Sequence, residues 1–173
     1  MASGLGQRLV EQYREIHATK TYGASSEKQL GFIYPHTLKL GTVRTILDYG
    51  CGRSRLVDWL AKLHDATAFR YDPAIPQFSI IPGTAFDLAL NTDVLEHIPE
   101  VDLDEVIGRI AGLSKRVFFN ISTVPAKAIL PSGENAHCTV RPPQWWQKRL
   151  GTQFRKVREV RSYKGSTCSF ITW

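Results

Sequence analysis

The segment Ile46–Ser54, with the sequence ILDYGCGRS, constrains the fold of this chain more than any other stretch. An apolar run ends at Asp48, two glycines follow at a spacing of two, and a helical pattern begins soon afterwards. This order predicts a strand, a tight turn and the start of a helix, an arrangement in which backbone N–H groups approach a bound small molecule. Gly50 and Gly52 suit a turn where a Cβ would block the ligand or require a positive φ.

Strand and helix patterns alternate along the rest of the chain. The expected strands are Arg44–Asp48, Thr67–Tyr71, Phe86–Leu90 and Arg116–Ile121, followed by a hairpin of Phe154–Ser162 and Ser166–Trp173. The expected helices are Leu5–Thr19, Leu30–Leu40 with a break at Pro35, a helix from Leu56 to Leu63, Val101–Leu113 and Pro142–Leu150. This alternation predicts an α/β fold with a mostly parallel sheet and an antiparallel hairpin at the C-terminal end.

The region after the second expected strand is too short for a full crossover. Fourteen residues separate Asp72 from Asp87, and three of them are prolines. A parallel crossover takes a dozen or more residues beyond the strands themselves, and these fourteen residues would have to supply a strand as well. We therefore expect Phe78–Ile81 to be a short edge strand and one or two helices to be absent. Pro125–His137 is expected to be mostly loop, with a short helix through Lys127–Leu130.

The length of 173 residues predicts one domain, with residues 1–40 as an N-terminal helical or lid segment and 41–173 as the core. The three cysteines show no metal-ligand spacing, so we expect reduced thiols, no metal site and a cytoplasmic location. No apolar run reaches membrane-spanning length and no signal peptide is recognisable. The net charge of +6 favours anionic partners, nucleic acid included, although a solvated helix end and the outward face of a strand explain it more simply.

Two carboxylates follow the first two expected strands. Asp48 stands where a dinucleotide-binding strand usually has an apolar residue, and Arg55 occupies the place of the third glycine of that fingerprint. A carboxylate there repels a pyrophosphate and attracts an ammonium group. Asp72 follows the next strand, where a carboxylate can accept hydrogen bonds from ribose hydroxyls, although an Asp-Pro pair also starts turns. A third polar segment, Asn91–Pro99, follows the expected strand Phe86–Leu90 and contains Asp93, Glu96 and His97. The alternative interpretation of this segment is a helix N-cap with a surface-exposed face.

These motifs together resemble class I S-adenosylmethionine-dependent methyltransferases. The resemblance rests on D48-Y-G-C-G, Y71-D-P, F86-D-L-A-L-N-T-D-V-L-E-H-I and the closing hairpin, and it covers about residues 41–173. It implies a Rossmann-like three-layer sandwich and S-adenosyl-L-methionine as cofactor. The cofactor-binding residues that it implies are Tyr22, Asp48, Gly50, Cys51, Gly52, Asp72, Pro73, Asn91, Thr92 and Asp93. This chain departs from the family in having Ser54 in place of a third glycine and no acidic motif on a third strand to meet adenine.

N135-A-H-C and W145-W are similar to segments of small phage- or prophage-associated methyltransferases. The resemblance implies that Asn135, His137, Trp145 and Trp146 bind the methyl acceptor. His137, with Asp93 and His97 as lesser candidates, is predicted to take the acceptor proton, because imidazole titrates near neutrality. A purely structural hydrogen bond of His137 remains an alternative, and at most one of two consecutive helical tryptophans can face a site.

The resulting hypothesis is methyl transfer to an O or N nucleophile of a small molecule, a nucleotide or an exposed polymer end. Two alternatives stay open: a catalytically inactive cofactor-binding protein, and a nucleic-acid-binding module that uses the basic C-terminal region. The segment after the expected strand Phe86–Leu90 reads NTDV rather than the D/N-P-P-Y/F motif of exocyclic amino methylation of DNA, and no Pro-Cys pair supports cytosine C5 chemistry.

Overall fold

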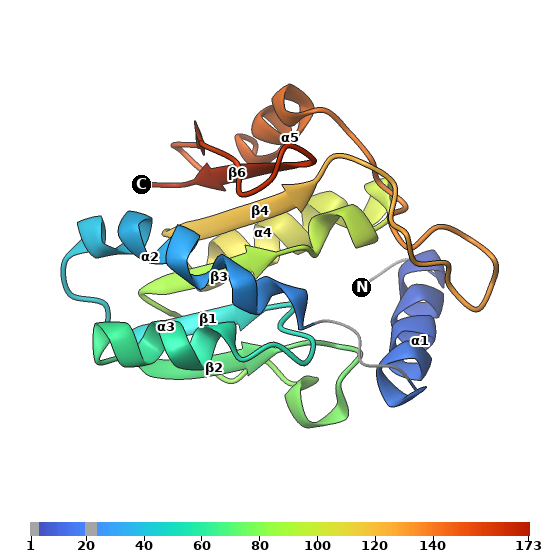
Figure 1. Ribbon diagram of the computed structural model, residues 1–173, viewed down its shortest axis with the longest axis horizontal. Helices are drawn as coiled ribbons and strands as arrows, with labels where there is room; N and C mark the ends of the chain where they lie inside the picture. Colours follow the sequence, from blue (N-terminus) through green and yellow to red (C-terminus); the bar gives the residue numbers. More distant parts are fainter. Residues whose placement is uncertain (1–3, 20–23) are drawn as a thin grey trace.

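The computed structural model describes residues 4–19 and 24–173 of the chain. These residues form a six-stranded sheet with helices on both faces, in the strand order β2-β1-β3-β4-β6-β5 (Figure 1). β1 pairs in parallel with β2 and β3, and β3 pairs in parallel with β4. β6 pairs antiparallel with both β4 and β5. The predicted α/β fold with a C-terminal antiparallel hairpin is confirmed.

The strands lie close to their predicted positions. Their bounds are β1 Thr45–Tyr49, β2 Thr67–Tyr71, β3 Leu88–Thr92, β4 Val117–Ser122, β5 Arg158–Val160 and β6 Thr167–Ile171. β3 begins and ends two residues later than predicted. The reason is that Phe86 packs into the core ahead of the ladder, while Asp87 accepts hydrogen bonds from the backbone N–H groups of Arg44 and Thr45.

The α-helices also follow the predicted order. They are α1 Gly4–Thr19, α2 Leu30–Thr37, α3 Leu56–His64, α4 Leu103–Leu113 and α5 Pro143–Leu150. Short 3-10 turns connect them: η1 Ser25–Gln29, η2 Leu38–Leu40, η3 Pro76–Phe78, η4 Leu95–His97 and η5 Glu100–Asp102. Pro35 lies inside α2 and does not end it, contrary to the prediction.

Successive residues of the central strands supply two separate cores, one on each face of the sheet. Ile46 and Phe118 pack with α2 and α3, whereas Leu47 and Phe119 pack with α4 and α5. All four side chains are fully buried, and burying a side chain of this size stabilises the fold by about 1.5–3 kcal/mol. Because both faces are covered, the strands read as continuous apolar runs rather than alternating ones.

Two predicted elements are wrong. Residues 78–81 form no strand, because the backbone N–H of Asp72 donates to the carbonyl of Phe78 and folds the segment back as η3, leaving Ile80 82% exposed. The described sheet therefore ends at β2. Residues 127–130 form no helix, because Ile129 makes a β-bridge with Asn135 and the loop closes on itself as a short hairpin.

The parallel strands all end at one edge of the sheet, and α1 lies beyond that edge (Figure 1). Leu9 and Ile16 of α1 pack against Leu130 and Ala136 of the loop that follows β4. This places the N-terminal helix and that loop around the carboxyl ends of the strands, where ligands of open α/β sheets bind. Among the described residues, no helix is both long and apolar enough to span a membrane.

Candidate functional site

The glycine turn after β1 is closed by the neighbouring strand. The backbone N–H groups of Gly50 and Cys51 both donate to the carbonyl of Tyr71, at 2.7 and 3.1 Å. Gly50 has φ 85° and Gly52 has φ 51°, which are values that side chains disfavour. A Cβ on Gly50 would also lie 2.5 Å from the side chain of Val94. The side chain of Val94 therefore requires a glycine at position 50, whether or not a ligand also does.

Asp72 fixes this turn through its carboxylate. One oxygen accepts a hydrogen bond from Gly52 N–H and the other from Ala74 N–H, both at 2.8 Å. The second bond is the turn-forming contact that the Asp-Pro pair predicts, so this reading of Asp72 is confirmed. A carboxylate has about four acceptor positions, and these two bonds leave lone pairs on both oxygens for further hydroxyl donors.

Asp48 is a buried carboxylate with no partner. Its side chain is 1% exposed, and neither oxygen accepts a hydrogen bond. Burial raises the pKa of Asp48 to about 7; Arg70 opposes this shift and Asp72 adds to it. Arg70 forms its ion pair with Asp58 instead. Because an unpaired buried charge is costly, this position favours a cationic ligand group. We call Asp48, Gly50, Gly52 and Asp72 the turn site.

Other predicted cofactor residues have structural roles. Asn91 is fully buried and its amide donates to the carbonyl of Tyr49 at 2.9 Å, which ties β3 to β1. Cys51 is buried and its thiol contacts the carbonyl of Gly52. Thr92 is buried at the end of β3, and Pro73 is half-buried after Asp72. Tyr22 lies outside the described residues.

Asp93 directly follows β3 in a strained conformation, with φ 57°. Its two oxygens accept hydrogen bonds from the side chains of Asn120, at 2.8 Å, and Gln29, at 3.0 Å. Burial raises its pKa. Positive φ at a residue other than glycine persists where the surroundings enforce it, which is common at functional sites. The sequence gives no signal for Gln29 as the partner of Asp93.

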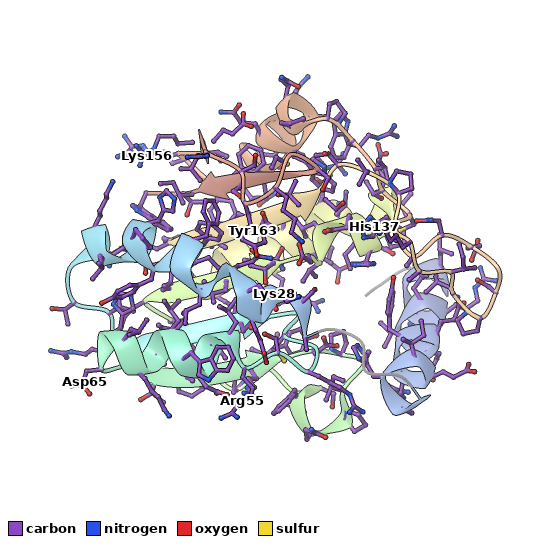
Figure 2. The ribbon with its side chains drawn as sticks, viewed as in Figure 1. Lys28, Arg55, Asp65, His137, Lys156 and Tyr163 are labelled. Carbon is purple, nitrogen blue, oxygen red and sulfur yellow. The ribbon has the colours of Figure 1, made fainter. Side chains whose placement is uncertain are left out.

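A second polar group lies beside Asp93 and consists of Glu96, His97 and His137, which we call the histidine cluster. Glu96 and His97 belong to η4, and His137 comes from the loop after β4. The two imidazole rings lie with centroids 4.7 Å apart and planes at 78°. Burial, reinforced by His137, lowers the pKa of His97 to about 4. Figure 2 shows His137 at the end of the sheet that faces α1.

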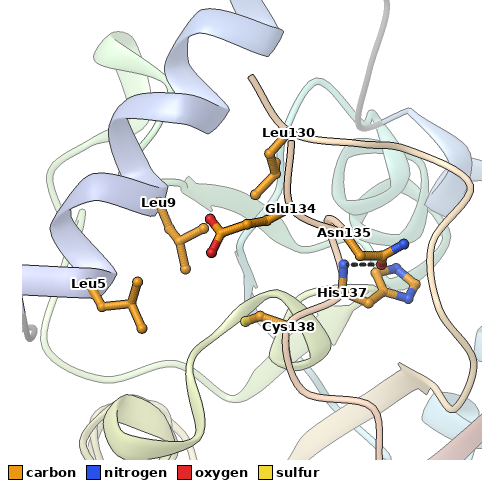
Figure 3. A pocket seen from close by; sticks show the side chains of 7 residues that line it. All are labelled: Leu5, Leu9, Leu130, Glu134, Asn135, His137 and Cys138. Atoms are coloured by element: carbon orange, nitrogen blue, oxygen red, sulfur yellow. Dashed lines mark hydrogen bonds between the residues drawn. The ribbon is translucent and has the colours of Figure 1, made fainter. Parts of the chain in front are cut away.

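A pocket of about 240 Å³ lies next to this cluster, between α1 and the loop (Figure 3). The side chains that line it are Leu5, Leu9, Leu130, Glu134, Asn135, His137 and Cys138. Asn135 shapes the loop: its oxygen accepts from the backbone N–H groups of Ala126 and His137, and its amide donates to the carbonyl of Ala126. The structure therefore brings together two of the predicted acceptor-binding residues, Asn135 and His137.

The tryptophan pair does not join that pocket. Trp146 is fully buried in the core that α4 and α5 form with the sheet, so it offers no surface to an acceptor and its predicted binding role is wrong. Trp145 lies on the outer part of α5, with the guanidinium groups of Arg141 and Arg149 5.6 and 5.5 Å from its ring centroid. Consecutive residues of a helix point in different directions, and of this pair only Trp146 is fully buried in the core.

The comparisons with known proteins find the fold and no closer relationship. No family model matches the chain, and no curated protein matches it. Among solved structures, an O-methyltransferase family protein from Burkholderia thailandensis is 16% identical, with a TM-score of 0.66. That match covers 94% of this chain and 62% of the other, so this chain spans less than two thirds of that protein.

Two further matches are of similar quality. The 1,6-didemethyltoxoflavin-N1-methyltransferase of B. thailandensis, solved with S-adenosylhomocysteine, is 16% identical with a TM-score of 0.61, covering 96% of this chain and 84% of that one. DhpI, solved as a complex with SAM and HEP, is 15% identical with a TM-score of 0.64, covering 99% of each chain. The chain thus has the fold of class I S-adenosylmethionine-dependent methyltransferases.

Proposed function

We propose that this chain is an S-adenosylmethionine-dependent methyltransferase that methylates an O or N nucleophile of a small molecule, a nucleotide or an exposed polymer end. The observation that carries the proposal is the carboxylate of Asp48, buried without a partner under the glycine turn. The bound S-adenosylhomocysteine and SAM named for two proteins of the same fold support it. The ammonium group of the methionine end is a cation that fits this position.

When bound, S-adenosylmethionine supplies an electrophilic methyl group on its sulfonium, so the protein mainly has to hold and align the reactants. In this proposal Asp48 attracts the ammonium group. Asp72 accepts the ribose hydroxyls with the lone pairs that Gly52 and Ala74 leave free. Asp93, held by Asn120 and Gln29, flanks the cofactor at the end of β3.

The acceptor is proposed to enter the pocket between α1 and the loop that carries His137. Three leucines give this pocket an apolar wall, and Glu134, Asn135 and Cys138 add polar groups. A volume of about 240 Å³ lies just below the roughly 300–1,000 Å³ usual for ligand pockets, so it suits a compact small molecule or the end of a larger one. His137 has its Nδ1 within 2.7 Å of the carbonyl of Val124, so it acts on an acceptor through its other nitrogen.

A second candidate is cofactor binding without transfer. It is favoured by the described sheet ending at β2, since residues 73–87 contain only η3 where a further strand was predicted. With or without methyl transfer, the segment that would recognise the adenine of the cofactor is residues 73–87. The nucleic-acid alternative has less support, because Lys156 of the basic C-terminal region lies far from His137 (Figure 2).

Calorimetry with S-adenosylmethionine tests the proposal on the wild type, Asp72→Asn and the control Asp65→Asn. Asp65 is an exposed residue at the C-terminal end of α3, away from the turn site. We expect weaker binding by Asp72→Asn and unchanged binding by Asp65→Asn. Equal affinities in all three proteins, or no binding by the wild type, would contradict the assignment. Labelled cofactor incubated with a metabolite extract then separates transfer from binding alone.

A further inference from the structure

The histidine cluster has the composition and convergence of a metal-binding site. Glu96, His97 and His137 each offer one ligand atom, and these three atoms lie within 4.8 Å of one another. Glu96 and His97 are adjacent in η4, whereas His137 follows forty residues later in the loop after β4. Two imidazoles and one carboxylate are a common ligand set for divalent transition metals.

Backbone carbonyls determine which nitrogen of each imidazole ring carries the proton. Nδ1 of His97 lies 2.8 Å from the carbonyl oxygen of Ala136, and Nδ1 of His137 lies 2.7 Å from that of Val124. A carbonyl oxygen can only accept a hydrogen bond, so Nδ1 of His137 carries the proton. The Tyr13 hydroxyl, 2.6 Å from Nδ1 of His97, donates its own proton to the carbonyl of Ala136, so its oxygen accepts and Nδ1 of His97 carries the proton as well. The lone pair is then on Nε2 in both rings. A carbonyl that orients a ring through its other nitrogen is the usual outer contact of a metal-binding histidine.

Glu96 is the least expected member of the cluster. Its side chain is fully buried; one oxygen accepts a hydrogen bond from the backbone N–H of Ser122 at 2.8 Å, and the other has no partner. Glu96 takes part in none of the ion pairs between described residues. A buried carboxylate oxygen without a donor is costly to keep, and a bound cation would offset that cost.

We propose that Glu96, His97 and His137 bind one divalent first-row transition-metal ion, such as zinc, manganese, cobalt or iron. The free carboxylate oxygen and the two Nε2 atoms are the ligands. Magnesium and calcium are disfavoured, because they prefer oxygen ligands. The sequence predicts no metal site, since its cysteines lack ligand spacing and the two histidines lie far apart in the chain.

Three protein ligands leave coordination positions for another molecule. His137 belongs both to the cluster and to the lining of the pocket between α1 and the loop, so these positions are adjacent to the proposed acceptor site. This step rests on the proposed function. A hydroxyl oxygen bound to the ion would have a lowered pKa and release its proton to solvent, which favours oxygen acceptors. His137 then acts through the ion and not as a free base.

Metal titration of the untagged, EDTA-treated full chain tests the site. Calorimetry with zinc chloride should show one ion per chain, and cobalt chloride should give the visible absorption of a nitrogen- and oxygen-bound ion. In Glu96→Gln the glutamine still accepts from Ser122, so the fold is kept. This variant and His137→Ala should lose at least about 10-fold in zinc affinity. The control His36→Ala removes a half-buried histidine that packs on Phe32 and Phe118, and should bind zinc normally.

Zinc should also raise the melting temperature of the wild type and of His36→Ala but not of Glu96→Gln. Absence of zinc binding by the wild type, or equal binding by all four proteins, would overturn the proposed site. Calorimetry with S-adenosylmethionine on the same EDTA-treated protein keeps the two proposals separate. Cofactor binding without zinc binding overturns only the metal site, and zinc binding without cofactor binding overturns only the proposed function.

Discussion

The turn site and the histidine cluster lie at the same edge of the sheet and both contain a buried carboxylate, Asp48 in one and Glu96 in the other. They are assembled in different ways. The turn site is built by two consecutive strands and the loops that follow them, and its hydrogen bonds join the ends of these two neighbouring strands. The histidine cluster needs η4, the loop after β4 and Tyr13 of α1, whose hydroxyl lies 2.6 Å from Nδ1 of His97.

Under the proposed function, this difference corresponds to two requirements of a methyltransferase, a cofactor site and an acceptor site. A cofactor that many proteins share can be held by a short local motif, because the same strand–turn–helix geometry recurs. An acceptor differs from one enzyme to the next and is met by loops, which change without disturbing the sheet. Here the loop after β4 and α1 pack mainly on each other, through Leu9, Ile16, Leu130 and Ala136.

The largest expected effect comes from exchanging the two carboxylates for amides. Asp48→Asn should weaken S-adenosylmethionine binding by at least about 30-fold, because it removes the buried partner of the ammonium group. It should leave zinc affinity unchanged, and Glu96→Gln should show the opposite pattern. Calorimetry with both ligands on both variants measures this. If each variant loses both ligands equally, the two sites are one.

Next in size is the backbone of the turn site. Gly50→Ala should destabilise the fold by about 2–4 kcal/mol, because the new methyl group meets Val94 and position 50 has a positive φ. Urea denaturation measures the free energy of unfolding. The control is Gly112→Ala in α4, where a Cβ meets nothing within 4 Å and helix propensity predicts a gain of about 0.5–1 kcal/mol. Equal effects of both substitutions would contradict the strain at position 50.

The buried carboxylate of Asp48 should also make stability depend on pH. Its pKa is about 7 in the folded protein against an ordinary 3.8, and a raised folded pKa gives stability that is present below 3.8 and lost as the pH rises through 7. Asp48→Asn should therefore unfold like the wild type near about pH 4 and be more stable by about 1–3 kcal/mol near pH 8. Urea denaturation at these two pH values tests the sign. A constant difference would show that burial does not raise the pKa of Asp48.

The smallest expected effect concerns the support of the histidine cluster. Asn135→Ala removes three hydrogen bonds within the loop and should cost about 1–2 kcal/mol of stability. Because Asn135 holds the backbone of His137, zinc affinity should fall by about 10-fold while cofactor affinity stays constant. Ser132→Ala, at an exposed position of the same loop, is the control. Unchanged zinc binding by Asn135→Ala would show that the loop is held by α1 alone.

Where local pattern and packing agreed, the sequence predicted the structure well. The strand Thr67–Tyr71 was predicted with the bounds of β2, and the glycine turn and the hairpin lie where the patterns put them. The failures occurred where one specific backbone contact, a few residues away in the chain, competed with the preference of the segment itself. Residues 78–81 have an apolar pattern suited to a strand, yet the bond from Asp72 N–H to Phe78 turns them away from the sheet edge. Pro35 lies within α2, where Ile33 and Thr37 on either side of it are buried.

The sequence by itself predicted the parallel strands, the C-terminal hairpin and the glycine turn, because strand periodicity and a glycine turn are properties of neighbouring residues. Only the tertiary structure decided which polar groups meet at the carboxyl edge. In the folded chain Trp146 is buried and Asn91 forms a hydrogen bond within the sheet. Gln29 binds Asp93, and His137 lies beside Glu96 and His97. These contacts connect residues tens of positions apart, and a local pattern carries no information on which distant partner a polar side chain finds.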